Sequence, residues 1–587
     1  MTKARETDSP KWQTWLDLLE WRSQHQGDHI AFTFLHSGEK EKQQLTYNQL
    51  YENARTVGSQ LMCQMNPGDR ALLFPSSGIE FINTLFGSLY AGIIAIPAFS
   101  PRGGNRSMDR LNAIVEDAEA KVALIDSKSL ARVQSQFSEN DSLQSIHFIT
   151  TESLHEPTGS VNGPASGITK DSTALIQYTS GSTSQPRGVI LNHRCLLHNT
   201  NMIGQAFEGK EAQVNVGWLP LYHDMGLIGN VMTPLFNGVH SVLMPPEAFL
   251  LKPLRWLKAI SDFKGRTSGG PNFAFELCID RISDEAKREL DLSSWKVAVC
   301  GAEPIRPTTL ARFSEAFSIS RFNKRAFYPC YGLAEGTLLV TGGNIDEEPK
   351  EYSFSAAALR INRVEPTDIS EESQNLIGCG HSWNEQEVII VNPSTGDLCK
   401  PNQVGEICVH GNSVAKGYWN LPQLTNELFE FTPNGCNKNY LKTGDLGFFF
   451  EKHLFITGRL KGLIIVNGQN YYAEDIEATV EQAHEAICLQ GAIALGIDQD
   501  QGEKVAVVAE VNRHFLRQEE RKEIDLADTI KSLEREIRMK VAARHDLTLE
   551  ALLLVRQMAI PKTSSGKIKR DVSMTTYLNK DFPTLIS

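Results

Sequence analysis

Short apolar segments alternate with amphipathic segments through the first two-thirds of this 587-residue chain. The apolar segments have the length and composition of buried strands and cover residues 69–75, 91–98, 121–126, 172–179 and 240–245. Between them, residues 78–91 and 108–120 carry apolar side chains at helical spacing. Strands that alternate with helices favour largely parallel sheets covered by helices, so the pattern predicts the α/β (mixed α+β) fold class.

The C-terminal part starts a new alternation after Gly458–Gly462. Helical patterns over residues 473–486 and 526–545 flank strand-like apolar segments, which is enough for a separate α/β domain of about 125 residues. Residues 345–376 are more polar and less periodic than their surroundings. An ordinary surface loop explains this segment as well as an excursion from the main fold does.

Charge and cysteine usage exclude several classes of protein. The net charge of −12 argues against a general nucleic-acid binder, yet it leaves room for an anionic ligand held by a few local cations or backbone N–H groups. The ten cysteines form no CxxC pair, so neither a zinc site nor a disulfide framework is indicated. Residues 1–21 lack the apolar core of a signal peptide, and the apolar run 89–99 is too short to span a bilayer. We therefore expect a cytoplasmic protein without a transmembrane segment.

A loop rich in glycine and hydroxyl groups, Tyr178–Ile190, lies between two apolar segments. Gly181 and Gly188 allow the backbone to approach a ligand closely, and Arg187 is able to neutralise phosphate charge. Hydroxyl and backbone N–H groups of this loop are suitable donors to phosphate oxygens. The loop lacks the GK[ST] signature of a Walker A motif. A solvated Ser/Gly-rich loop is the plain alternative.

Four further motifs follow in order along the chain. They are Gly301–Pro304, Tyr331–Glu335, Lys442–Asp445 and Pro561–Ile568. Each one taken alone is explained by a turn or a solvated loop. Their occurrence together, in this order and after the phosphate-type loop, is not explained in that way.

The ordered set resembles the acyl- and aryl-adenylate-forming superfamily, and within it the chain looks most like the fatty acyl-AMP ligases. The segments that carry the closer resemblance are 89–104, 218–238, 270–282, 298–310 and 327–343. The resemblance implies a large N-terminal domain, residues 1–457, made of two stacked α/β subdomains and a small β-barrel. It also implies a hinge region at 458–470, with Lys461 as the hinge residue, and a mobile small α/β C-terminal domain at 471–587.

The activity implied by the resemblance has two steps. A fatty acid reacts with ATP to give acyl-AMP and pyrophosphate, and the acyl group then passes to the phosphopantetheine thiol of an acyl carrier protein. The implied cofactors are ATP and Mg²⁺. Residues of about 350–376 match, in position and length, an insertion that is thought to keep coenzyme A from serving as the acceptor in these ligases.

The resemblance also assigns residue roles. Lys567 is the catalytic cation between the two anionic reactants, Glu335 is a catalytic residue that binds Mg²⁺, and His223 is a catalytic or gating residue. The implied nucleotide-binding residues are Thr179, Ser180, Gly181, Ser182, Thr183, Arg187, Gly301, Ala302, Glu303, Tyr331, Gly332, Ala334, Asp445 and Arg459. The implied acyl-pocket residues are His223, Asp224, Met225, Leu227, Ile228 and Met232, although core packing explains the apolar ones almost as well.

A few positions depart from the superfamily pattern. Ser184 and Arg187 stand where relatives often carry Gly and Lys, Ala334 stands where Thr is frequent, and Gly462 replaces a frequent Asp. Arginine at 187 keeps the positive charge that phosphate binding needs.

Three alternatives to the ligase stay open at this point. An acyl-CoA synthetase shares the first step and differs in the acceptor, and the segment 350–376 favours the ligase. A catalytically inactive nucleotide- or acyl-binding module is disfavoured because Glu335, Asp445 and Lys567 are all present. An amino-acid adenylation domain needs an acidic partner for the substrate ammonium group, a role that Asp224 is able to fill.

Overall fold

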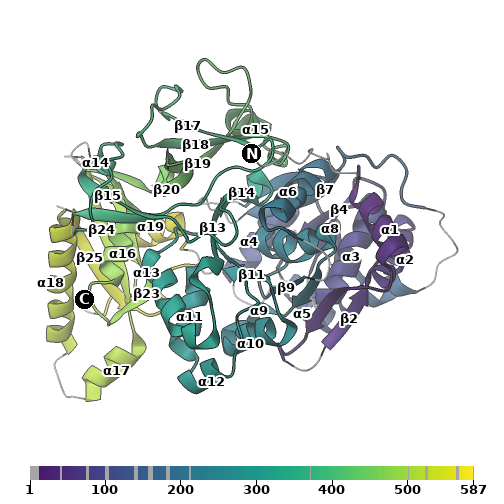
Figure 1. Ribbon diagram of the computed structural model, residues 1–587, viewed down its shortest axis with the longest axis horizontal. Helices are drawn as coiled ribbons and strands as arrows, with labels where there is room; N and C mark the ends of the chain where they lie inside the picture. The colour runs from purple at the N-terminus through teal and green to yellow at the C-terminus, as the bar shows by residue number, and fades with distance from the viewer. Residues whose placement is uncertain are drawn as a thin grey trace.

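A computed structural model describes residues 12–39, 42–74, 78–99, 105–137, 143, 145–156, 163–179, 186–209, 213–370, 372–466, 469–499, 502–521, 526–545, 547–562 and 568–585. Two large sheets form the body of the molecule, and a third sheet and a C-terminal unit lie against them (Figure 1). Among these residues, no helix combines the length and the apolar composition that a membrane span requires.

The first large sheet has six strands, and four of them match the four apolar segments expected in residues 69–179. Their spatial order is β6 (His147–Thr150), β5 (Val122–Ile125), β3 (Arg70–Leu73), β4 (Ile94–Pro97), β7 (Thr173–Thr179) and β8 (Arg187–Asn192). All neighbours are parallel except β7 and β8, which form an antiparallel hairpin. This hairpin brings Thr179 opposite Arg187, so both ends of the glycine-rich loop are fixed to the sheet.

The second large sheet has eight strands. Their order is β14 (Leu339–Gly342), β13 (Phe327–Gly332), β12 (Val297–Cys300), β11 (Thr267–Gly270), β9 (Val214–Gly217), β10 (His240–Leu243), β1 (Ile30–Leu35) and β2 (Lys42–Thr46). The six central strands run parallel, and β2 and β14 are antiparallel edge strands. The expected α/β class with largely parallel sheets is therefore confirmed.

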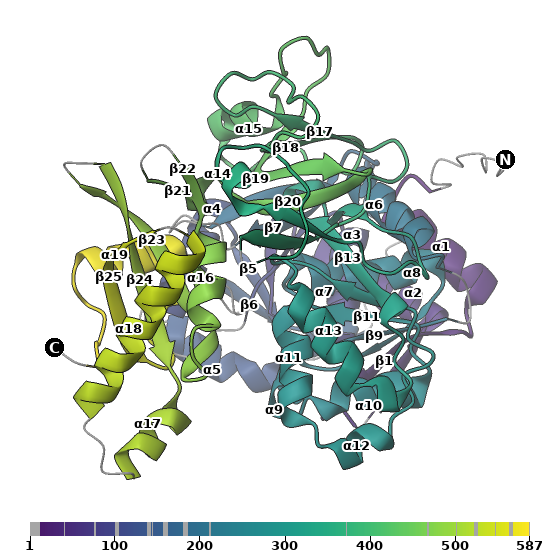
Figure 2. The same ribbon diagram turned by 60° about the vertical axis from the view of Figure 1, so that its left-hand side comes forward.

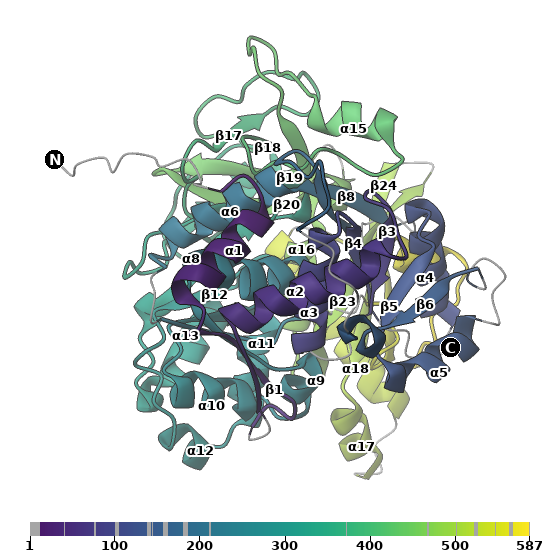
Figure 3. The same cartoon turned by 90° about the vertical axis from the view of Figure 1, so that its right-hand side faces the viewer.

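Helices fill the space between the two large sheets and cover their outer faces (Figure 3). The inner layer contains α1 (Trp15–Gln26), α2 (Tyr47–Met62), α3 (Gly78–Tyr90), α6 (His193–Ala206) and α8 (Thr233–Asn237). The outer layers contain α4 (Asn105–Ala118) and α5 (Ser127–Phe137) on one side and α10 (Leu254–Phe263), α11 (Asn272–Arg281) and α13 (Pro307–Ala316) on the other.

Alternation of side chains along the buried strands explains this layering. Leu73 and Ala95 face the inner layer, whereas Leu72 and Ile96 face α4 and α5. Successive residues of a strand point to opposite faces, so a strand that is apolar throughout has to be covered on both sides. The continuous apolar segments of the sequence are the direct cause of the layered body.

The third sheet is antiparallel and open. Its order is β17 (Glu387–Val391), β18 (Gly405–His410), β19 (Leu441–Phe450) and β20 (His453–Arg459). The small β-barrel expected from the sequence is not closed among the described residues. The outer edge of β20 pairs with residues 379–380 instead of closing on β17. Leu454 N donates to Gly380 O at 2.7 Å, and Cys379 N donates to Leu454 O at 2.7 Å.

The segment 345–376, for which the sequence left a surface loop or an excursion from the main fold open, contributes a two-stranded hairpin. Strand β15 (Glu351–Ser355) pairs with β16 (Ser373–Ile377), and the short helix α14 (Ala356–Arg360) follows β15. Phe354, Leu359 and Val364 are buried against Phe448 and Phe455 of the third sheet. The few apolar side chains of this segment pack against the third sheet, whereas polar ones such as Gln374 and Asn362 contact the C-terminal unit.

The C-terminal unit stands beside the rest of the molecule in Figure 2, and it has its own core. Its elements are β21 (Leu463–Val466), β22 (Gln469–Tyr472), α16 (Ala473–Glu481), β23 (Ile487–Gln499), β24 (Gly502–Val511), α17 (Arg513–Arg521), α18 (Leu526–His545), β25 (Leu549–Arg556) and α19 (Arg570–Leu578). Strand β24 is central, antiparallel to β23 and parallel to β25. Helices α16 and α18 pack through Ile476, Val480, Ile537 and Val541.

Candidate active site

A cavity of about 930 Å³ lies where the body, the hairpin β15–β16 and the C-terminal unit meet. The segments after the parallel strands β12 and β13 contribute to its wall, together with the end of β7. Backbone N–H groups and loop side chains gather at the carboxyl ends of parallel strands, which is where open α/β sheets bind ligands. From the opposite side, residues of α16 and residues 568–571 complete the lining.

Three of the predicted nucleotide-binding residues, Tyr331, Asp445 and Arg459, come together in one corner of this cavity. Asp445, in β19, accepts a hydrogen bond from the Tyr331 hydroxyl at 2.7 Å and from Arg459 Nε at 3.0 Å. The side chain of Asp445 is only 9% exposed, whereas that of Arg459 is 58% exposed. A carboxylate has about four lone-pair positions, so Asp445 keeps acceptor capacity for a ligand hydroxyl.

Register explains why Asp445 and Arg459 meet. They are directly opposite each other in the antiparallel pair β19–β20, although fourteen positions separate them in the sequence. Tyr331 reaches the same point from β13 of a different sheet. Burial and the neighbouring Asp445 carboxylate raise the pKa of the Tyr331 hydroxyl, which therefore acts as a hydrogen-bond donor here.

The Gly301–Glu303 segment follows β12 and lines the cavity, with Ala302 in the left-handed region at φ 70°. A non-glycine residue in this region is strained, and such strain concentrates at ligand-binding segments. Glu303 accepts a hydrogen bond from Gln490 Nε2 of the C-terminal unit at 2.8 Å. Three residues further on, Arg306 forms an ion pair with Glu481 of α16, also at 2.8 Å. This predicted nucleotide-binding segment is thus in direct contact with the C-terminal unit.

Glu335 is half-buried in the cavity wall, and burial raises the pKa of its carboxyl group. Its Oε1 accepts a hydrogen bond from the Tyr418 hydroxyl at 2.7 Å. The guanidinium of Arg187 lies 5.5 Å from the centre of the Tyr418 ring. Tyr418 therefore contacts two predicted site residues, Glu335 and Arg187. Arg187 itself does not line the cavity. Tyr418 was not predicted from the sequence, because it carries no charge and lies in no recognisable motif.

The donor set around Glu335 fits Mg²⁺ that is bound together with a nucleotide. Among the residues that the structure describes, no group of three or more His, Cys, Asp or Glu side chains is arranged to hold a metal ion. Mg²⁺ commonly uses one or two carboxylates, and phosphate oxygens and water supply its other ligands. A single carboxylate whose pKa is raised by burial, facing a ligand-sized cavity, is consistent with that mode of binding.

His223 and Asp224 lie at the start of the short helix α7 (Asp224–Leu227), and both line the cavity together with Met225. His223 Nδ1 and Asp224 Oδ1 are 2.6 Å apart, and the same oxygen accepts from Met225 N. Of the predicted acyl-pocket residues, these three are in contact with the cavity.

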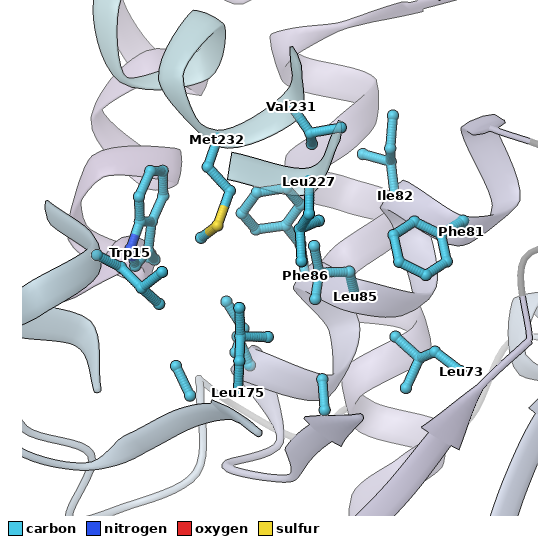
Figure 4. Close-up of a cluster of buried hydrophobic side chains, with 14 of the residues drawn as sticks. Trp15, Leu73, Phe81, Ile82, Leu85, Phe86, Leu175, Leu227, Val231 and Met232 are labelled. Atoms are coloured by element: carbon cyan, nitrogen blue, oxygen red, sulfur yellow. The ribbon is translucent and has the colours of Figure 1, made fainter. Parts of the chain in front are cut away.

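The other three predicted acyl-pocket residues lie elsewhere. Leu227, Ile228 and Met232 are fully buried in the core between the two large sheets. Leu227 and Met232 pack among side chains of α1 and α3, including Trp15 and Phe86 (Figure 4). In the segment 227–232 these side chains point toward the helix layer. The opposite side of this segment, with Gly229 and Asn230, lines the cavity. The alternative explanation by core packing applies to these three residues.

Several predicted residues lie outside the described residues. They are Ser180, Gly181, Ser182 and Thr183 of the glycine-rich loop, and Lys567. Their described neighbours Thr179 and Ile568 both line the cavity. Gly332, Ala334 and the expected hinge residue Lys461 line it as well. The structure thus gathers most of the residues that the sequence singled out, and their individual roles stay predictions.

The hairpin β15–β16 also contacts the C-terminal unit. Gln374 Nε2 donates to Asp475 Oδ1 at 2.7 Å, and Asn470 Nδ2 donates to Asn362 Oδ1 at 3.1 Å. Burial raises the pKa of Asp475 to about 7. The guanidinium of Arg360 lies 5.2 Å from the centre of the Tyr471 ring. These contacts tie the predicted insertion to the unit that the sequence predicts to be mobile.

Comparison with known proteins gives close matches over nearly the whole chain. The family model described as AMP-binding enzyme matches residues 19–419, and a model described as Disco-interacting protein 2-like, AMP domain, matches residues 461–587. The chain is 39% identical over 577 residues to the medium-chain-fatty-acid–[acyl-carrier-protein] ligase JamA of Moorena producens (strain JHB), covering 97% of this chain and 96% of that protein.

Two further matches also cover nearly the whole chain. The long-chain-fatty-acid–AMP ligase FadD26 of Mycobacterium tuberculosis (strain ATCC 25618 / H37Rv) is 34% identical over 582 residues, which are 97% of this chain and 98% of the relative. The crystal structure of a fatty acyl-adenylate ligase from L. pneumophila, in complex with acyl adenylate and pyrophosphate, is 36% identical with a TM-score of 0.72. That similarity covers 98% of this chain and 97% of the other.

Proposed function

The chain belongs to the family of AMP-binding enzymes, and within that family we propose that it is a fatty acyl-AMP ligase that passes its acyl group to a carrier protein. The enzyme activates a fatty acid with ATP, releases pyrophosphate and transfers the acyl group to a phosphopantetheine thiol. The observation that carries this proposal is the single cavity that Tyr331, Asp445, Glu335 and Ile568 line together. The similarity to fatty acid ligases over 97% of the chain supports the choice of substrate.

The chemical problem in the first step is that both reactants are anions. A fatty carboxylate has to approach the α-phosphate of ATP, and the site has to neutralise charge while it aligns the attack. Asp445 would hold the ribose through its remaining lone pairs, with Arg459 and Tyr331 fixing its orientation. Lys567 would supply the positive charge between carboxylate and phosphate. Glu335 would hold Mg²⁺, which when bound acts as a Lewis acid on phosphate oxygens.

The contacts of residues 350–376 support a carrier protein as the acceptor. The second step in this superfamily requires the C-terminal unit to reorient, and this chain ties that unit to the hairpin through Gln374, Asn362 and Arg360. Free coenzyme A offers few contacts to offset the loss of these interactions. A carrier protein offers a larger surface and therefore more compensating contacts. The cytoplasmic location expected from the sequence stays a prediction.

Product analysis tests this proposal. The protein is incubated with ATP, Mg²⁺ and fatty acids of several lengths, and acyl-AMP is measured by mass spectrometry before coenzyme A or a holo carrier protein is added. We expect acyl-AMP with at least one acid and transfer to the carrier protein only. Efficient formation of acyl-CoA by the intact chain would contradict the choice of acceptor, and absence of any acyl-AMP would contradict the function itself.

The variant Lys567→Ala tests the catalytic assignment. Loss of one preorganised charge contact should lower the rate of acyl-AMP formation by roughly 10²–10³-fold while ATP still binds. Lys531→Ala, which removes an exposed lysine of α18, is the matched control and should leave the rate unchanged. Equal rates for the two variants would remove Lys567 from the mechanism.

A further inference from the structure

The cavity extends along the strands, away from the nucleotide corner. Gly301, directly after β12, and Thr267, at the start of β11, both line it. Thr267 pairs with Val297, which is four residues before Gly301. At a rise of about 3.3 Å per residue, the two levels are roughly 13 Å apart. One end of the cavity therefore lies near the start of the strands, and we call it the inner end. It is lined by Asn215, Thr267, Asn230, Ile203 and Phe207.

The inner end carries two buried amides. Asn215 of β9 is 3% exposed, and Asn230, in the π-helical turn Ile228–Met232, is 8% exposed. Asn215 Nδ2 donates to Ser241 Oγ at 3.0 Å and to Asn230 Oδ1 at 3.3 Å. Ser241 Oγ in turn donates to the backbone oxygen of Asn230 at 2.7 Å. These bonds fix the orientation of both amides.

Half of the hydrogen-bonding capacity of this pair is unused. Asn215 Oδ1 and Asn230 Nδ2 make no hydrogen bond with any residue that the structure describes, and neither atom is sealed from open space. The cavity is the open space that both residues line. A buried amide without a partner is costly, so a pair of this kind indicates a ligand with matching polar groups.

We propose that the inner end binds a hydroxyl group on the distal part of the acyl chain, so that the substrate is a hydroxylated fatty acid. This inference rests on the proposed function. The free oxygen of Asn215 accepts and the free N–H of Asn230 donates, and a hydroxyl group is a small group that does both. A ketone only accepts, and a carboxylate brings a charge into a site formed by amides and apolar side chains. Ile203 and Phe207 enclose the methylene chain.

The local backbone supports a specific role for Asn230. A π-helical turn is rare and is found frequently at functional sites. Gly217 faces the Asn230 amide, and a Cβ at position 217 would lie 2.5 Å from its Cγ atom. Glycine at this position of β9 thus makes room for the amide next to the sheet. The site is built before the ligand arrives, which limits the cost of ordering it on binding.

The test compares matched acids in the complete enzyme. Octanoic, decanoic and dodecanoic acid are each paired with their ω-hydroxy derivative, and kcat/KM for acyl-AMP formation is measured for all six. For at least one length we expect a preference of roughly tenfold or more for the hydroxy acid, because the unsubstituted chain leaves both amides unpaired. The double variant Asn215→Leu, Asn230→Leu should abolish or reverse this preference.

A matched control separates loss of the site from general damage. Asn237→Leu removes an amide from the same helical region, where Asn237 Nδ2 donates to Thr233 O at 2.8 Å and the residue does not line the cavity. This variant should keep the preference of the wild type. If the double variant does not fold, the kcat/KM values of the wild-type enzyme for the six acids still show whether the hydroxy acids are preferred.

Two results would overturn the inference. One is a wild-type enzyme that uses the unsubstituted acid at least as well at every length, which would mean that water satisfies the amides. The other is a preference that the double variant retains. In both cases acyl-AMP forms, so the proposed function survives; failure of all six acids to give acyl-AMP would instead contradict the proposed function.

Discussion

The body and its contact with the C-terminal unit are held together in different ways. Between the two large sheets, side chains such as Trp15, Phe86 and Leu227 are completely buried and packed against one another. Across the contact with the C-terminal unit lie the ion pair Arg306–Glu481 and amide hydrogen bonds such as Gln490–Glu303 and Gln374–Asp475. A smaller apolar part joins them, where the buried ring of Tyr472 belongs to the cluster of Phe354 and Phe448.

This difference has a physical consequence. Separating the packed layers would expose a large apolar surface to water at about 25 cal/mol per Å², whereas polar groups at a parted contact regain hydrogen bonds with water. A contact that is polar in large part therefore separates at a lower cost in free energy than the packed layers do. We expect substitutions in the core to change stability and substitutions at the contact to change the partition between reaction steps.

The largest effect is expected in the core. Leu227→Ala removes a completely buried side chain and should lower the free energy of unfolding by about 2–5 kcal/mol. Urea denaturation monitored by tryptophan fluorescence measures this change. The residual folded enzyme should keep its preference among fatty acids, because Leu227 does not line the cavity. A stable variant with altered chain-length preference would mean that Leu227 belongs to the acyl pocket after all.

The second effect concerns the hairpin β15–β16. Ser355 and Ser373 are paired, so residues 356–372 are replaceable by a two-residue Asn-Gly turn that preserves the pairing. Removal of the docked segment should relieve an orientational bias of about 3 kcal/mol and raise acyl-CoA formation more than a hundredfold. Mass spectrometry of the products with coenzyme A present provides the measurement.

Formation of acyl-AMP by this shortened chain is the control, since the change leaves Glu335, Asp445 and Lys567 in place. A folded variant that adenylates normally and still ignores coenzyme A would show that the hairpin is not what excludes this acceptor.

The third effect concerns the ion pair between Arg306 and Glu481. Arg306→Ala should slow acyl-AMP formation by roughly fivefold to tenfold, because the pair holds the C-terminal unit next to the Gly301–Glu303 segment. The melting temperature should change little. Arg312→Ala is the matched control, since Arg312 pairs only with Glu276 and Asp280 on the same body among the described residues.

A double-mutant cycle with Glu481→Ala isolates the interaction. Strictly additive effects of the two substitutions on the adenylation rate would show that the pair has no role in orienting the unit.

The smallest effect is a pH dependence at the hairpin contact. Burial raises the pKa of Asp475 from 3.8 to about 7, so the folded protein holds a proton that the unfolded chain has released. The stability that this proton contributes is complete below pH 3.8 and is lost as pH rises through about 7. Between pH 6 and 8 the loss amounts to about 1.4 kcal/mol.

Thermal unfolding of wild type and Asp475→Asn across this pH range measures the change. The asparagine variant cannot ionise, so the difference between the two proteins should vary with pH in the stated direction. A difference that is constant from pH 6 to 8 would place the pKa of Asp475 near its ordinary value.

The sequence by itself determined the layers of the body and the position of most site motifs. Apolar strands that must be covered on both faces leave few arrangements, and loops that follow parallel strands meet at one edge of the sheet. Gly301, Tyr331 and Glu335 were assigned from the family resemblance, and because they follow or end parallel strands the structure brings them into one cavity. The alternation of strand and helix depends on local spacing, which any short window of the sequence contains.

Tertiary structure alone decided which face of a segment meets the cavity. Leu227, Ile228 and Met232 have the composition of an acyl pocket, yet they turn into the core while Asn230 of the same segment lines the cavity. Tyr418 reaches Glu335, and residues 379–380 take the edge of β20 and leave the third sheet open. Each of these outcomes depends on contacts between segments far apart in the chain. Packing and hydrogen bonding in the folded protein determine which of these segments meet, and the local sequence pattern does not.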